Sequence, residues 1–220
     1  KESRTKSNFF AHIFIWVLIL FTLFPIYVVI TSSFNPTGSL ATSELWPKIW
    51  SLKNYKVLFT LPSVPYLTWV KNSMLLATAN ALISVFVGAS SAFAFSRMRF
   101  KGRKIGLQAL LLVQVFPSFL ALAAIYVMME RVYTVFPAIG LGSLGGLLLI
   151  YLGGSMGVNA WLLKGYIDTI PMELDEAARI DGASTFQVYW LIFFPLAAPV
   201  LAVTALLSFI GTFNEFVLAF

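Results

Sequence analysis

The chain has 220 residues, of which 59% are apolar and only 11% are charged, and its mean hydropathy is +0.86. A soluble domain carries about 25% charged residues, so this composition excludes an ordinary soluble protein and indicates a membrane protein. The net charge is +6, but no nucleic-acid partner is expected, because the basic residues cluster beside apolar segments, as membrane anchors do. The chain has no cysteine, which excludes disulfides and thiolate metal sites.

Five segments are apolar enough, and at about 20 residues or more long enough, to cross a bilayer as helices. They are residues 9–32, 70–95, 105–129, 143–166 and 195–220. The sequence therefore predicts an all-α, polytopic membrane bundle in which residues 1–220 form one transmembrane domain. The last apolar segment reaches Phe220 without a polar flank, and the first residue is Lys1 rather than Met. We therefore expect that the protein continues beyond both ends.

Lysine and arginine decide the expected orientation. Lys1, Arg4 and Lys6 precede the first span, and the turn RMRFKGRK at 97–104 holds five basic residues. Since two spans separate these clusters, both lie on one side, which the positive-inside rule assigns to the cytoplasm. The N-terminus and the insert at 167–194 are then cytoplasmic, and the long polar loop at 33–69 faces outside. The plain interpretation of the basic turn is a topological anchor at the lipid headgroups.

Small residues and prolines give the expected packing of the spans. Small residues at four-residue spacing let membrane helices approach closely, and this spacing occurs at Ser84, Gly88 and Ala92, and again at Gly153 and Gly157. A proline inside a helix leaves a backbone carbonyl unpaired and favours a kink, which is expected at Pro25, Pro117 and Pro195.

Few polar side chains lie inside the spans, and such groups usually face the bundle interior or a water path. The candidates for a translocation path or gate are Asn80, Gln114, Asn159, Thr204, Asn214 and Glu215. Hydrogen bonds that only join helices explain each of them equally well. Glu215 lies about 20 residues beyond Pro195, roughly 30 Å along a helix. This predicts a place near the outer end of the fifth span, as part of an outer gate or as an interfacial anchor.

No arrangement of residues indicates catalysis. The segment GLGSLGG (140–146) matches a dinucleotide-binding pattern in its letters, but it joins two spans instead of following a strand. His12, the only histidine, has no ligand partners in the sequence, so no metal site is expected. The acids of 168–181 lie on a surface segment without a histidine, which makes a membrane enzyme the weaker hypothesis. A secondary transporter is disfavoured because the spans lack a chain of ionisable groups.

The charged insert around LDEAARIDGAS (174–184) interrupts the apolar pattern. Pro171 suits the first position of a helix, and Gly182 is expected to end that helix in the left-handed conformation. Ser184 with Gln187 three residues later predicts a capping box at the start of a second helix. The sequence therefore predicts a helix–turn–helix on the cytoplasmic face.

The composition of the insert indicates what it contacts. A helix that rests on anionic lipid carries Lys and Arg on its polar face. The insert instead carries one basic residue, Arg179, against five acids, which are Asp168, Glu173, Asp175, Glu176 and Asp181. Its apolar face, formed by Leu174, Ala177 and Ala178, is thin enough for another surface to approach. We therefore expect a cytoplasmic protein partner.

The insert resembles the E-A-A-x3-G-x9-I-x-L-P loop of the permeases of ATP-binding-cassette (ABC) importers. The motif fits at Glu176, Ala177, Ala178, Gly182, Ile192 and Pro195, while Phe194 replaces the usual leucine. Longer stretches, such as AFAFSRMRFKGRK and VQVFPSFLALAAIYVMMERV, look like the MalG-type permeases of maltose and maltodextrin importers. Sister branches of the family carry other sugars or glycerol phosphates, and this alternative stays open.

The resemblance implies a transport subunit of the bacterial inner membrane that has no catalytic activity or cofactor of its own. ATP and Mg²⁺ would be bound by a dimer of ATP-hydrolysing partners, a second, MalF-type permease subunit would share the path, and an extracytoplasmic binding protein would deliver the sugar. The insert would be the coupling loop, with Glu176 meeting a basic residue of the ATPase. The residues implied in coupling are Glu176, Ala177, Ala178, Arg179, Asp181 and Gly182. A six-span core is usual, so a sixth span, a tail and an outer loop are expected beyond Phe220.

Overall fold

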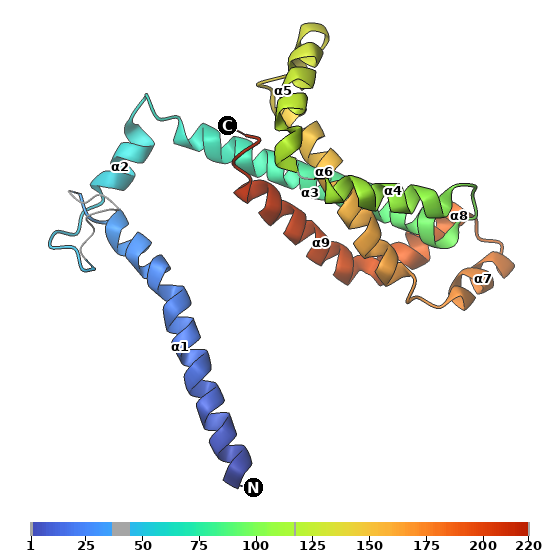
Figure 1. Ribbon diagram of the computed structural model, residues 1–220, viewed down its shortest axis with the longest axis horizontal. Helices are drawn as coiled ribbons and strands as arrows, with labels where there is room; N and C mark the ends of the chain where they lie inside the picture. The colour runs from blue at the N-terminus through green and yellow to red at the C-terminus, as the bar shows by residue number, and fades with distance from the viewer. Residues whose placement is uncertain (1, 37–44, 117, 220) are drawn as a thin grey trace. The chain divides into compact units, whose positions relative to one another are not determined.

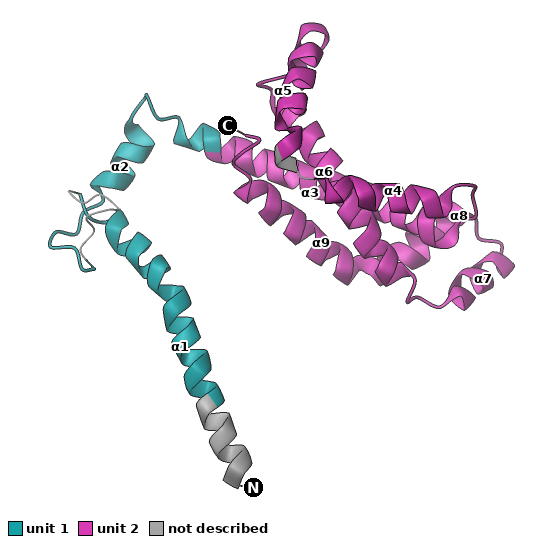
Figure 2. Cartoon of the chain, viewed as in Figure 1, with its two compact units in different colours: residues 1–69 teal, residues 70–220 magenta. Residues whose placement is uncertain are grey.

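The computed structural model describes the backbone of residues 2–36, 45–116 and 118–219, and the side chains of these residues except 2–10, 118 and 119. Every regular element in these ranges is a helix (Figure 1). The chain divides into two compact units, Lys1–Trp69 and Val70–Phe220 (Figure 2). Four helices are long and apolar enough to cross a membrane, or five if one bent pair counts as a single span. The predicted all-α membrane bundle is confirmed.

The first unit contains α1 (Glu2–Ser33) and α2 (Lys53–Thr60). The α1 helix runs through Pro25 as one element, and its membrane-length window has no buried residue within the chain, as suits a helix that faces lipid or a partner. The α2 helix lies inside the predicted polar loop. The side-chain amide of Asn54 donates to the carbonyls of Ser33 and Asn35 at 3.1 and 2.9 Å, and so ties α2 to the end of α1.

The second unit contains most of α3, which starts in the first unit, and all the later elements. Their bounds are Tyr66–Arg97 for α3, Arg103–Val115 for α4, Ser118–Val135 for α5, Pro137–Ile139 for η1, Leu144–Ile167 for α6, Met172–Ile180 for α7, Thr185–Gln187 for α8, Val188–Phe193 for η2 and Phe194–Asn214 for α9. The predicted third span, 105–129, corresponds to the pair α4 and α5, which are bent by 103° relative to each other. Pro117, the predicted kink, lies outside the described residues.

The predicted close packing is present at four of the five small residues. Ser84 and Ala92 are fully buried, and a Cβ added to Gly88 would lie 2.9 Å from the Cβ of Asn159 on α6. A Cβ on Gly157 would lie 2.6 Å from the side-chain nitrogen of Gln114 on α4. Gly153 faces open space, so the prediction is wrong there. The four-residue spacing of small residues predicts that they share one face of a helix, but it does not tell which of them contact another helix.

The last span and the predicted second helix of the insert form one continuous helix, Thr185–Asn214. Its start is α8, its end is α9, and between them η2 is a π-helical segment in which the N–H of Phe194 donates to the carbonyl of Tyr189, five residues earlier. Pro195 has no N–H and therefore cannot continue the α-helical pattern, and π-segments occur where the pattern is interrupted. The helix ends at Asn214, before the predicted limit of the span.

Candidate functional site

The charged insert folds largely as its sequence indicates. Pro171 is the N-cap of α7, one position before the predicted place. Gly182 has a φ of +86°, so the predicted left-handed turn is confirmed. The Ser184 hydroxyl accepts from the N–H of Gln187, and the Gln187 side chain accepts from the N–H of Ser184, so the capping box is confirmed as well. These two short-range signals end α7 at Ile180 and start α8 at Thr185.

One face of α7 is held against the chain and the opposite face is free. Asp175 and Ala178, three residues apart, are buried, while Glu173 and Glu176 are exposed. The predicted apolar face is wrong in one member, because Ala178 packs into the protein's own core while Leu174 and Ala177 stay exposed. Two large apolar side chains stand out from the surface of the insert, namely Ile180 at 87% and Phe186 at 71% exposure.

Arg97, the last residue of α3, holds the buried face of α7. Its Nε lies 2.8 Å from the carboxylate of Asp175, and the two side chains are 5% and 11% exposed. The same guanidinium donates to the carbonyls of Ile167 and Ile170 at 3.2 and 2.6 Å. Arg97 therefore does more than the predicted headgroup anchor, because its charge is almost fully removed from solvent and joins three segments of the chain.

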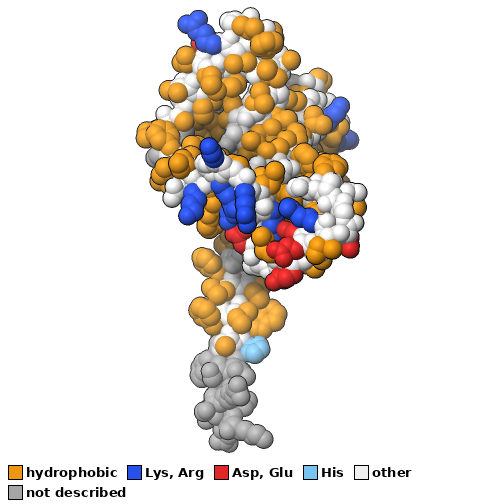
Figure 3. All heavy atoms as spheres, turned by 90° about the vertical axis from the view of Figure 1, so that its right-hand side faces the viewer, with side chains coloured by type: hydrophobic (Ala, Val, Ile, Leu, Met, Phe, Trp, Pro, Cys, Tyr) orange, Lys and Arg blue, Asp and Glu red, His pale blue; other side chains and the backbone are white. Residues whose placement is uncertain are grey.

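A second polar cluster lies beside this ion pair, around Asp168 at the end of α6. The Ser96 hydroxyl donates to its carboxylate at 2.6 Å, Lys164 pairs with the other oxygen, and Arg103 donates to the carbonyl of Ser96. Burial acts to raise the pKa of Asp168, but the hydrogen bonds from Lys164 and Ser96 and the charges of Lys164 and Arg103 outweigh it and hold this pKa below its usual value. Figure 3 shows the basic and acidic side chains side by side at this end of the second unit.

A cavity of about 380 Å³ lies between α3, α6 and α9. Four of the six polar residues predicted from the spans line it, namely Asn80, Asn159, Thr204 and Glu215. The two others do not. Gln114 donates to the carbonyl of Gly154 at 2.9 Å and joins α4 to α6, while Asn214 is exposed at the end of α9.

Hydrogen bonds link the polar residues of this cavity across the helices. The Asn80 amide donates to the Thr212 hydroxyl at 2.7 Å, and the Asn159 amide donates to the Ser208 hydroxyl at 3.1 Å. Thr204 donates only within its own helix, to the carbonyl of Val200. These bonds join α3 and α6 to α9.

Glu215 caps the end of α9 and belongs to the same cavity. One carboxylate oxygen accepts from the Tyr151 hydroxyl at 2.7 Å, and the other accepts from the backbone N–H of Leu218 at 2.9 Å. Both oxygens are therefore positioned by neighbouring groups.

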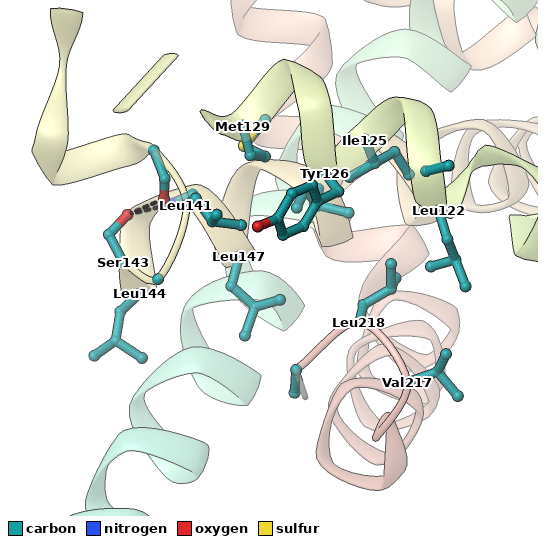
Figure 4. Close-up of a pocket in the computed structure, with 16 residues that line it drawn as sticks. Leu122, Ile125, Tyr126, Met129, Leu141, Ser143, Leu144, Leu147, Val217 and Leu218 are labelled. Atoms are coloured by element: carbon teal, nitrogen blue, oxygen red, sulfur yellow. Dashed lines mark hydrogen bonds between the residues drawn. The ribbon is translucent and has the colours of Figure 1, made fainter. Parts of the chain in front are cut away.

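A larger cavity, of about 710 Å³, lies between α5, the loop 140–143, α6 and residues 217–219 (Figure 4). Its walls are mainly apolar, with Tyr126 reaching into it between Leu122 and Leu147. None of the predicted path residues lines it. Sequence reasoning missed this cavity because ordinary leucines and isoleucines in a membrane span carry no signal for a void.

Comparison with known proteins decides the family. Residues 84–219 match the family described as "Binding-protein-dependent transport system inner membrane component". The chain belongs to this family. The predicted ABC importer permease is thereby confirmed, and as a member of this family the permease is a transport component and not an enzyme.

Curated relatives match nearly all of this chain. It is 38% identical over 215 residues to the maltose/maltodextrin transport system permease protein MalG of Vibrio vulnificus (strain YJ016), covering 93% of this chain and 72% of the relative. It is 37% identical over 223 residues to the galactooligosaccharides transport system permease protein GanQ of Bacillus subtilis (strain 168), covering 100% and 76%.

A solved structure has the same fold. It is the crystal structure of a bacterial ABC transporter involved in the import of the acidic polysaccharide alginate. The match has a TM-score of 0.68 and 20% identity, and covers 98% of the permease and 73% of that chain.

Proposed function

We propose that the permease carries an oligosaccharide of the maltose and maltodextrin class across the bacterial inner membrane, driven by ATP hydrolysis in partner subunits. The names of the MalG relatives support this class, and the similarity to GanQ makes galactooligosaccharides the second candidate. An ATPase dimer that binds ATP and Mg²⁺, a MalF-type second permease and a sugar-binding protein complete the importer. The permease itself holds no cofactor.

The observation that carries the coupling role is the division of α7 into a clamped face and a free face. Arg97 and the core hold Asp175 and Ala178, so the opposite face points away from the bundle. We call this free face, with its neighbour Phe186, the docking surface, formed by Glu173, Glu176, Ala177, Ile180 and Phe186. Exposed acids beside large exposed apolar groups are suited to a protein cleft lined with basic residues. We propose that the ATPase binds at the docking surface.

The cavity between α3, α6 and α9 is the proposed contribution of this chain to the sugar path. Polar side chains within membrane spans usually face a bundle interior or a water path. Here Asn80 on α3, Asn159 on α6 and Glu215 at the end of α9 converge on one space. Their bonds to α9 also make the cavity sensitive to any movement of that helix.

The coupling role is tested with two substitutions that act differently. Glu176→Ala removes a charge from the docking surface, and we expect the ATPase to dissociate roughly tenfold more easily, which corresponds to about 1.4 kcal/mol at a partly wet interface. Gly182→Val forces a β-branched residue into a left-handed turn and redirects α7 without changing any charge. Both variants should insert into the membrane and lose sugar uptake.

The measurements are sugar uptake and recovery of the ATPase with the purified membrane complex. Glu130→Ala is the matched control, because it removes a carboxylate that is also exposed but lies on α5, outside the insert. The control should take up sugar normally. Normal uptake in both Glu176→Ala and Gly182→Val would show that the insert is only a solvated surface helix.

A further inference from the structure

The described side chains that line the cavity between α3, α6 and α9 carry a negative charge without a positive one. Among the described residues that line it, Glu215 is the single charged side chain, and no lysine or arginine is present. Both oxygens of Glu215 accept hydrogen bonds from neutral donors, so no cation of the lining offsets the carboxylate. The cavity therefore has a negative potential that its own wall does not cancel.

The wall of the cavity presents both donors and acceptors, because each asparagine amide uses one of its two N–H groups in the bonds between helices. The amide of Asn80 donates to Thr212, the amide of Asn159 to Ser208, and the hydroxyl of Tyr151 to Glu215. The amide oxygen of Asn80 is buried, and no donor among the described residues reaches it. This oxygen is closed off from solvent, so a ligand reaches it only after a side chain of the wall moves.

We propose that this cavity binds the hydroxyl groups of a neutral sugar and excludes anionic sugars, and that Glu215 sets this selection. A sugar hydroxyl can donate to the Glu215 carboxylate, and its oxygen can accept from the Ser208 hydroxyl, since both residues line the cavity. A uronate or a sugar phosphate brings a second negative charge into a space of low dielectric without a compensating cation, which is repulsive. The inference rests on the proposed sugar path and separates the two substrate classes that the sequence left open, neutral oligosaccharides and glycerol phosphates.

The absence of cysteine from the chain permits a direct test in the assembled importer, with cysteine-free partner subunits. Ser208→Cys places one thiol in the cavity wall. The thiol is treated with three methanethiosulfonates of similar size, which carry a positive, a neutral and a negative group. Each reaction rate is divided by the rate of the same reagent with a small thiol in solution, which removes differences in the intrinsic reactivity of the reagents. We expect the anionic reagent to react at least about tenfold more slowly than the cationic one.

Two further variants test whether Glu215 causes the difference between the anionic and cationic labelling rates. Glu215→Gln should bring the anionic and cationic rates to within about twofold of each other, whereas Glu215→Asp keeps the charge and should keep the ratio. The carboxylate also affects how readily the new thiol ionises, but this changes the rates of all reagents equally and cancels in the ratio. Addition of maltooligosaccharide with its binding protein during ATP turnover should slow labelling by the neutral reagent.

Four results would overturn the inference. Equal normalised rates in Ser208→Cys alone, or a ratio that survives Glu215→Gln, would show that Glu215 does not set the charge preference. Charge-dependent labelling without protection by sugar would show that the cavity does not bind the substrate. A thiol that no reagent modifies would show that solutes do not enter. None of these results affects the docking surface, which the Glu176 and Gly182 variants test independently.

Discussion

The ion pair between Arg97 and Asp175 gives the sharpest quantitative prediction. Asp175→Asn keeps the size of the side chain and removes its charge, which leaves the Arg97 guanidinium almost fully buried without a counter-ion. Breaking one side of a buried pair costs about 3–5 kcal/mol. Arg97 retains the carbonyls of Ile167 and Ile170 as acceptors, so we expect about 3 kcal/mol, the lower end of the range.

This loss should appear as local opening of α7 and leave the spans in place, because no apolar segment changes. A loss of about 3 kcal/mol in the free energy of local opening corresponds to a roughly 100-fold faster hydrogen exchange of the α7 backbone amides. Hydrogen–deuterium exchange measured by mass spectrometry on the permease in its complex reads this rate directly. Arg97→Lys should give an intermediate effect, since an ammonium keeps the charge but loses the planar fork of donors.

Glu173→Gln is the control, because Glu173 lies on the same helix but is exposed. Its exchange rates should match those of the unmodified permease. If Asp175→Asn exchanges no faster than this control, the pair does not hold α7, and the division of the helix into a clamped and a free face loses its physical basis.

Three other predictions concern packing, acid stability and helix capping. Gly88→Val should destabilise the fold by about 1–3 kcal/mol, because the added side chain overpacks against Asn159, and this should appear as a lower thermal unfolding midpoint in detergent. Gly153→Ala should leave the midpoint unchanged, because the added methyl group meets open space. The pKa of Asp168 is lower in the folded protein than its ordinary value of 3.8, so the carboxylate stabilises the fold above this ordinary pKa and stops doing so as the pH falls through the folded pKa. Between pH 6 and pH 3 the thermal unfolding midpoint should therefore fall less steeply in Asp168→Asn than in the unmodified permease. Equal slopes in the two proteins would contradict this. Ser184→Ala should cost about 1 kcal/mol of local stability, seen as faster exchange at the start of α8.

Short-range signals in the sequence predicted structure well. The turn at Gly182 and the capping box at Ser184 each depend on a few neighbouring residues, so their geometry follows from local chemistry. The polar residues within the spans were also informative, since burying them in a bilayer is costly unless they meet one another. Gln114 shows the limit of this rule, because its partner is a backbone carbonyl, which has no signature in the sequence.

Features that depend on distant parts of the chain were not predictable. Arg97 and Asp175 lie in separate segments, and a count of lysines and arginines per loop treats Arg97 like any other charge. A kink between α4 and α5 was expected from Pro117, but the 103° angle between the two helices was not predictable, because hydropathy measures whether a segment suits lipid and carries no information on direction. The continuity of α8 with α9 was missed for a related reason, since Pro195 suggested a boundary that the π-segment bridges.

The helix Thr185–Asn214 has a mechanical consequence. It contains 30 residues, which corresponds to about 45 Å at 1.5 Å per residue, and it runs from the capping box to the carboxylate of Glu215. A rotation of about 5° around its middle moves each end by about 2 Å, which is enough to break a hydrogen bond. If this helix moves as a rigid body, we expect a displacement of its start, at Phe186, to produce a displacement of similar size and opposite direction at its end, beside Glu215.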